Sequence, residues 1–155
     1  MRHILYRGKK IANDVWTYGF YFERLINGKK HSYIQYETSD EGFGVDEVAP
    51  DTVGQYTGIR DDECLQIFEG DILAVRYSDD PTTYITEVQA YGNTLCVDVD
   101  GEDYDFTAID FAVVDWRHEG CELKVISNIY DRNKDTDASI EFLKTVNPFS
   151  EYYNF

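Results

Sequence analysis

Short apolar stretches separated by turn residues fill the second half of the sequence, and their spacing limits the chain to closely packed strands. Six stretches follow Ile67 and have the alternating or β-branched composition of strands, at residues 71–77, 83–91, 94–99, 103–109, 111–116 and 121–127. Turn residues lie between them, at 79–81, 92–93, 100–101 and 118–120. A βαβ fold needs a helix between successive strands. The spacing therefore predicts an antiparallel meander forming a small barrel or sandwich.

The first third of the sequence predicts a small antiparallel sheet. Ile4 to Tyr6 has the composition of a short strand, followed by a turn at 8–10. Residues 15–22 and 31–36 have strand composition as well, and Asn-Gly at 27–28 is a strong hairpin signal between them. Residues 37–66 are rich in Asp, Glu and Gly without a sustained period, which predicts a long connector.

The C-terminal 24 residues predict one helix and a docking tail. Asp135 or Thr136 would cap the helix, and Asn147-Pro148 would end it. The tail then carries four aromatic residues in seven positions, namely Phe149, Tyr152, Tyr153 and Phe155. Aromatic residues at this density are expected to dock on the core of the chain, on a sister subunit or on a partner.

Charge is unevenly distributed along the 155 residues. Residues 1–36 carry a net charge of +5 and residues 37–155 a net charge of −21. The acidic part disfavours nucleic-acid binding, because such binding needs a basic face. Three interpretations remain: neutralisation of the acids by the basic start within or between subunits, attraction of a basic protein, or a solvated acidic surface.

The expected location is the cytoplasm, without contact with a membrane. No apolar stretch approaches the roughly 20 residues that span a bilayer, and the chain opens without a charged-then-apolar leader. The three cysteines, Cys64, Cys96 and Cys121, are scattered and odd in number, so they are expected to be reduced thiols.

Three groups of residues are candidates for catalytic or metal sites, and each has a simpler structural interpretation. The acids at 98–105 crowd around a glycine, but their spacing does not fit a calcium loop. His118 and Cys121 are spaced as half of a zinc knuckle without a second closely spaced pair. Glu69 and Asp71 flank Gly70, where a positive φ and backbone hydrogen bonds to Asp71 are expected. We predict no catalytic residue, metal or cofactor.

Four blocks carry a resemblance to a known family. They are residues 48–59, with the string Thr-Val-Gly-Gln-Tyr-Thr-Gly; residues 67–72; residues 2–9 with 16–19; and residues 125–130. In their order along the chain, from residue 2 to about 131, the blocks closely resemble the phage YopX family, although Ser127 and residues 60–64 depart from its pattern. The resemblance implies a protein of bacteriophages or prophages whose C-terminal half is similar to an SH3-like barrel. It implies no established activity and supplies no catalytic residues.

These observations predict a mainly β chain with a small antiparallel N-terminal sheet and an SH3-like β-barrel. The expected segments are an N-terminal β segment (1–47), a connector (48–66), the barrel (67–131) and a short helix with the aromatic tail (132–155). The expected function is a non-enzymatic phage or prophage accessory protein that binds itself and an unknown host or phage protein. An acidic DNA mimic that inhibits a host DNA-binding protein and an enzyme using carboxylates are the alternatives. The candidate interaction residues are Gln55, Tyr56, Phe149, Tyr152, Tyr153 and Phe155.

Overall fold

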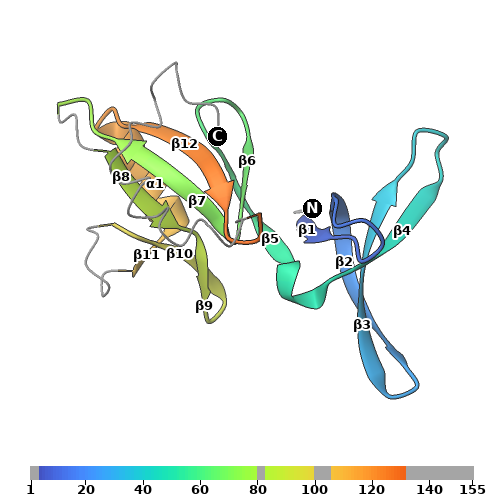
Figure 1. Cartoon of the computed structure of the whole chain (residues 1–155). Coiled ribbons are helices and arrows are strands. Elements are labelled where there is room, and N and C mark those ends of the chain that lie inside the picture. Colours follow the sequence, from blue (N-terminus) through green and yellow to red (C-terminus); the bar gives the residue numbers. More distant parts are fainter. Residues whose placement is uncertain (1–3, 80–82, 100–105, 132–155) are drawn as a thin grey trace. The chain divides into compact units, whose positions relative to one another are not determined.

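The protein is mainly β, as predicted. The computed structural model describes residues 4–79, 83–99 and 106–131 (Figure 1). The predicted helix at 135–147 and the aromatic tail lie outside the described residues. The chain divides into two compact units, residues 1–56 and residues 57–155, here called the N-terminal and the C-terminal unit. Their boundary falls inside the segment 48–66.

The N-terminal unit is an antiparallel sheet in the order β4-β3-β2-β1-β5. Its elements are β1 (Tyr6–Lys9), β2 (Trp16–Ile26), β3 (Lys29–Glu37), β4 (Phe43–Val48), a 3-10 turn η1 (Pro50–Thr52) and the start of β5 (Gly54–Arg60). Asn27 and Gly28 join β2 to β3 with φ angles of 51° and 75°. Two successive positive φ angles are typical of a type I′ turn, so the predicted hairpin is confirmed.

This sheet curls until the end of β1 meets the end of β4. The Ile11 amide donates to the Glu47 carbonyl at 3.0 Å, and the Ala49 amide donates to the Lys9 carbonyl at 2.8 Å. A Cβ at Gly8 would lie 3.0 Å from the Val48 Cβ, so only glycine allows this approach without displacement. The predicted turn at residues 8–10 is therefore wrong, because Gly8 and Lys9 belong to β1.

The C-terminal unit contains two three-stranded antiparallel sheets, ordered β12-β7-β8 and β11-β10-β9. Its elements are β6 (Gln66–Phe68), β7 (Asp71–Arg76), β8 (Thr83–Glu87), β9 (Gln89–Tyr91), β10 (Thr94–Asp98), β11 (Phe106–Ala108), α1 (Ile109–His118) and β12 (Glu122–Asn128). The second part of β5 runs beside β6. Only the buried Val88 separates β8 from β9, so the stretch predicted as one strand at 83–91 passes from one sheet to the other. Closure into an SH3-like barrel stays a prediction.

One helix replaces a predicted strand. Residues 111–116 were expected to be extended, but they lie in α1. The buried residues of this helix are Ile109, Ala112, Val113 and Trp116. Their spacing of i, i+3, i+4 and i+7 is the helical period, and it buries one face of α1 in the core with Leu73, Val75 and Leu123. The strand prediction is wrong because the composition of Phe-Ala-Val-Val favours a strand, whereas the spacing of the buried residues around it is helical.

The predicted connector also contains regular structure. β4 and the whole of β5 lie within residues 37–66, where no strand was expected. In β4 the apolar residues Phe43, Val45 and Val48 are interrupted by Gly44, Asp46 and Glu47. This acidic composition is typical of a loop, but pairing with β3 along the whole of β4 overrides it.

Two carboxylates cover the free edge of β12. Asp61 is buried and accepts the amides of Glu63 and Leu65, each at 2.9 Å, and that of Val125 at 3.0 Å. Asp62 accepts the Leu123 amide at 2.8 Å. The loop after β5 therefore satisfies backbone donors of an edge strand that a further chain would otherwise pair with.

Candidate interaction surface

Alternation along the strands of the N-terminal unit defines an inner and an outer face of its sheet. Thr17, Ser32, Ile34 and Val48 are buried on the inner face. Residues of opposite parity therefore point outward, and the strand register places them side by side. We call this outward surface the aromatic face; its apolar members are Tyr18, Phe20, Phe22, Tyr33, Phe43 and Val45.

The centre of the aromatic face is built by cross-strand pairs. Phe22 of β2 lies opposite Tyr33 of β3, with the ring centroids 5.3 Å apart and the rings inclined by 17°. Gln35 of β3 lies between Phe20 and Val45 in the register of β2, β3 and β4. The Phe22 and Tyr33 rings therefore stack on this face, while the polar Gln35 separates Phe20 from Val45.

The β4 side of the aromatic face is strongly exposed. Phe43 keeps 67% and Val45 keeps 51% of its surface accessible. The two side chains are two residues apart on one strand and therefore share a face. Contiguous exposed apolar groups on a folded protein mark binding surfaces more often than isolated ones do.

A hollow adjoins Phe43 at the turn between β3 and β4. It has a volume of about 260 Å³ and is lined by Glu37, Thr38, Ser39, Glu41, Gly42 and Phe43. Asp40 in the same turn accepts a hydrogen bond from the Thr38 hydroxyl, and this bond lowers the pKa of Asp40 below its usual value. The hollow thus offers carboxylates and hydroxyls beside an aromatic ring.

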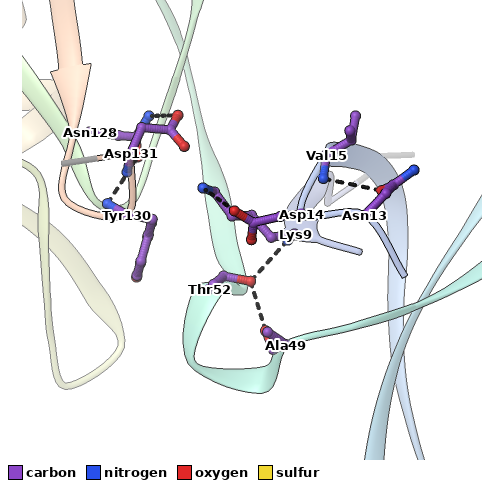
Figure 2. Close-up of polar contacts among 9 residues, drawn as sticks. All are labelled: Lys9, Asn13, Asp14, Val15, Ala49, Thr52, Asn128, Tyr130 and Asp131. Atoms are coloured by element: carbon purple, nitrogen blue, oxygen red, sulfur yellow. Dashed lines mark hydrogen bonds and ion pairs between the residues drawn. The ribbon is translucent and has the colours of Figure 1, made fainter. Parts of the chain in front are cut away.

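On the β1 side, Trp16 contacts two buried cations. The Arg7 guanidinium carbon lies 4.5 Å and the Lys9 ammonium 5.5 Å from the Trp16 ring centroid, both within cation–π range. The Lys9 amide donates to the Thr52 hydroxyl at 2.9 Å, which in turn donates to the Ala49 carbonyl at 2.7 Å (Figure 2). These contacts fix β1 against η1 and hold this border of the face in place.

Ion pairs within the N-terminal unit offset much of its basic charge. Lys10 lies 3.2 Å from Asp46, and His31 Nδ1 lies 2.6 Å from Glu47. Seven basic and eight acidic residues give the unit a net charge of −1, whereas seven basic and 22 acidic residues give the C-terminal unit −15. Lys10 of the basic start thus pairs with an acid of β4, while the surplus of acids in the C-terminal unit stays open to all three interpretations.

The edge of the hairpin carries a small polar network. Glu23 accepts a hydrogen bond from the Tyr21 hydroxyl at 2.7 Å and lies 3.1 Å from the Lys30 ammonium. The Tyr21 bond, followed by Lys30, lowers the pKa of Glu23. Burial raises the pKa of Tyr21. Neither group therefore titrates near neutral pH.

Gln55 and Tyr56, predicted as interaction residues, lie in strand pairing. Gln55 pairs with Tyr6 of β1, and the Tyr56 amide donates to the Leu5 carbonyl at 2.8 Å. The next residue, Thr57, donates its hydroxyl to the Ile67 carbonyl at 2.8 Å. The segment Gln55 to Thr57 therefore connects β5 to β1 and β6, while a binding role for the side chains of Gln55 and Tyr56 stays a prediction. Phe149, Tyr152, Tyr153 and Phe155 lie outside the described residues.

Gly70 and Asp71 have the structural roles expected of them. Gly70 has a φ of 87°, and the Phe68 amide donates to Asp71 at 2.7 Å. The Ile129 amide donates to the Gly70 carbonyl at 2.9 Å. After β12, Asn128 accepts the Tyr130 amide at 3.0 Å and donates to Asp131 at 2.7 Å, as Figure 2 shows. The sequence blocks 67–72 and 125–130 thus contact each other at the turn that contains Gly70.

Residues that commonly bind metals do not cluster in the described part of the chain. No set of three or more His, Cys, Asp or Glu side chains is placed to hold a metal in residues 4–79, 83–99 and 106–131. Cys121 is buried, which raises the pKa of its thiol, and Cys64 and Cys96 are also free. In the same ranges, no helix has the length and apolar character needed to cross a membrane.

Sequence reasoning missed the aromatic face as a binding candidate. Aromatic residues occupy every second position from 16 to 22, which indicates that they share one face of a strand. Composition alone does not tell whether this face or the opposite one points outward. The inner face is identified by the small residues Gly8, Gly19 and Gly44, where a Cβ would lie 3.0 Å or less from a neighbouring atom. Such close approach becomes visible only in the folded sheet.

Comparison with known proteins identifies the family. No curated protein matches the chain. The family described as YopX protein matches residues 5–134, which include most of each unit. The matched range contains β1 to β12 and every described contact of the string around Tyr56 and Gly70. The chain belongs to the YopX protein family.

Proposed function

We propose that this chain is a non-enzymatic protein-interaction module of a phage or prophage. It acts in the host cytoplasm, associates with itself and binds a further host or phage protein. The observation that carries the proposal is the aromatic face, in particular the exposed Phe43 and Val45 beside the Phe22 and Tyr33 pair. Aromatic residues are enriched in protein interfaces, and a few of them supply most of the binding energy.

The division of labour between the units supports a binding role. The C-terminal unit has the continuous apolar core, so it provides a stable base. The N-terminal unit is held by strand pairing and presents large side chains outward. A sheet of defined register holds these side chains rigidly, which reduces the entropy lost on binding. The free cysteines Cys64, Cys96 and Cys121 fit a reducing compartment.

The test compares two surface variants of the full chain. Phe43→Ser/Val45→Ser alters the aromatic face, and Tyr91→Ser alters a side chain of similar exposure, 70%, in the C-terminal unit. Proteins captured from the host by wild type are purified and their binding to each variant is measured. We expect the double variant to weaken binding of the specific partner at least about tenfold, with Tyr91→Ser unchanged. Equal binding by all three proteins would contradict the proposal.

The two alternatives from the sequence stay predictions. The acidic surplus that motivates a DNA mimic belongs to the C-terminal unit, which carries −15. Capture of a DNA-binding protein that is unaffected by Phe43→Ser/Val45→Ser but is released by moderate salt would favour the mimic. Turnover of a substrate would favour the enzyme.

A further inference from the structure

The hairpin of β2 and β3 extends beyond its neighbouring strands as a two-stranded arm (Figure 1). β1 pairs with β2 only up to Gly19, and β4 pairs with β3 only from Ser32 onward. Residues 24–31, here called the arm, are therefore paired only with each other. A two-stranded ribbon is marginally stable in water by itself. Its length is not needed to complete the sheet.

The tip of the arm combines apolar and basic side chains. Leu25 keeps 72% and Ile26 keeps 42% of its surface accessible. Arg24 and Lys29 flank Ile26 on one side of the ribbon, because Ile26 lies opposite Lys29 and Arg24 is two residues away. No ion pair involves Arg24 or Lys29 within the described part of the chain. Lys30, on the other side, is already paired with Glu23.

A surface of opposite charge lies on the outer side of α1 in the C-terminal unit. Phe111 and Val114 keep 69% and 66% of their surface accessible, and their spacing of i and i+3 places them side by side. Asp110 and Asp115 flank this apolar pair and are also exposed. No ion pair involves either aspartate among the described residues. We call these four side chains the α1 patch.

We propose that the arm of one copy docks on the α1 patch of a second copy of this chain. Ile26 would contact Phe111 and Val114, while Arg24 and Lys29, on the same side of the ribbon, meet the two aspartates; Leu25 points to the other side. The inference rests on the self-association in the proposed function and uses the end of the hairpin, on the same side of the sheet as the aromatic face but without its residues. Two different surfaces make the contact heterologous, so it either closes by reciprocal exchange or continues as a chain of subunits.

Charge favours a second copy over other occupants. A duplex could accept a two-stranded ribbon in its major groove, but tight binding needs more phosphate contacts than Arg24, Lys29 and Lys30 supply. Every copy of the chain carries a net charge of −16, so the attraction that favours a second copy is local, between the arm cations and the two aspartates. The C-terminal unit, with a net charge of −15, attracts the arm and offers apolar side chains of matching size.

The test is a charge exchange on the full chain. Masses are measured by light scattering and sedimentation between about 1 and 500 µM, the range expected for a small interface. R24E/K29E and D110K/D115K should each weaken self-association at least about tenfold, because like charges then oppose each other. An equimolar mixture of these two variants should associate again, since each copy then finds a complementary surface. Higher salt should weaken assembly of wild type.

Several outcomes would overturn the inference. The first is a wild type that stays monomeric over the whole concentration range, and the second is a pair of charge variants that keep the wild-type mass. The third is a mixture of the two variants that does not associate, although both variants retain the wild-type unfolding curve. Binding of duplex DNA or anionic vesicles that R24E/K29E abolishes, with self-association unchanged, would reassign the arm. Phe43→Ser/Val45→Ser should keep the wild-type mass, so failure of this inference and failure of partner binding are distinguishable.

Discussion

The two units differ in where they place their large apolar side chains. The C-terminal unit buries them: Leu73, Val75 and Trp116 lie in one core that joins both of its sheets to α1. In the N-terminal unit, the fully buried apolar side chains among the described residues are Ile34 and Val48, and the rings of Tyr18, Phe20 and Phe43 are exposed. The difference indicates that apolar burial stabilises one unit while strand pairing and polar contacts order the other, which leaves several large apolar side chains exposed.

The largest expected effect tests the core of the C-terminal unit. Trp116→Ala should lower the free energy of unfolding by about 3–5 kcal/mol, because a 2% exposed indole is replaced by a cavity. The indole N–H is buried without a hydrogen-bond partner among the described residues, so Trp116→Phe should cost clearly less. Phe111→Ala on the exposed side of the same helix should change stability by about 0.5 kcal/mol or less. Urea unfolding measures all three; a similar loss for Trp116→Ala and Phe111→Ala would contradict the core assignment.

A second prediction concerns buried polar contacts of the C-terminal unit. Asp61→Ala removes a buried carboxylate that accepts three backbone amides, including that of Val125 in β12. We expect a loss of about 2–3 kcal/mol, since unsatisfied buried donors are costly. Glu63→Ala is the matched control in the same loop, because it removes only a surface ion pair with Lys124. Hydrogen exchange should accelerate along β12 in Asp61→Ala, and unchanged protection there would show that the edge is not held by this carboxylate.

The third prediction compares two glycines, one from each unit. Gly70 and Gly28 both have a positive φ, but a Cβ at Gly70 would lie 2.7 Å from the Tyr130 ring and one at Gly28 would meet nothing within 4 Å. Gly28→Ala should therefore cost about 1 kcal/mol for backbone strain alone, and Gly70→Ala about 2 kcal/mol or more. Thermal unfolding measures the difference. In the background Tyr130→Ala, the two alanine variants should become similar in cost; a persistent gap would mean that Tyr130 is not the cause.

The mainly β fold was predictable from the sequence, and so were the turns at Asn27-Gly28 and Gly70, unlike the turn expected at residues 8–10. Asn27-Gly28 and Gly70-Asp71 adopt the expected conformations because their φ angles depend on the residues themselves. The helix α1 was missed because its signal lies in the spacing of Ile109, Ala112, Val113 and Trp116, whereas the strand prediction counted β-branched and aromatic residues. Long-range packing then decided between two locally acceptable conformations.

The candidate surface was harder to predict than the fold. The alternation in β2 shows which side chains share a face of the sheet. Which of the two faces is buried depends on the curvature of the sheet, which brings the end of β1 next to Val48. β4 was missed because acidic residues such as Asp46 and Glu47 are typical of loops. In the folded sheet they contact Lys10 and His31, which the sequence alone does not place beside them. Charge counted along the sequence therefore suggested a strongly basic start, although the folded N-terminal unit is nearly neutral.

The smallest expected effect concerns an exposed carboxylate of the N-terminal unit, in contrast to the buried Asp61. The pKa of Glu23 is lowered first by the Tyr21 hydroxyl and then by Lys30. Tyr21→Phe should thus raise the Glu23 pKa toward its ordinary value of 4.5 more than Lys30→Met does. Because a lowered pKa stabilises the folded state only above that ordinary value, any contribution is lost as the pH falls through the folded pKa. Side-chain NMR titration between pH 2 and 7 resolves the two shifts, and a larger shift in Lys30→Met would show that the ammonium, rather than the phenol, governs this carboxylate. The unfolding curve at neutral pH should be the same for Lys30→Met and wild type, since exposed ion pairs add little to stability.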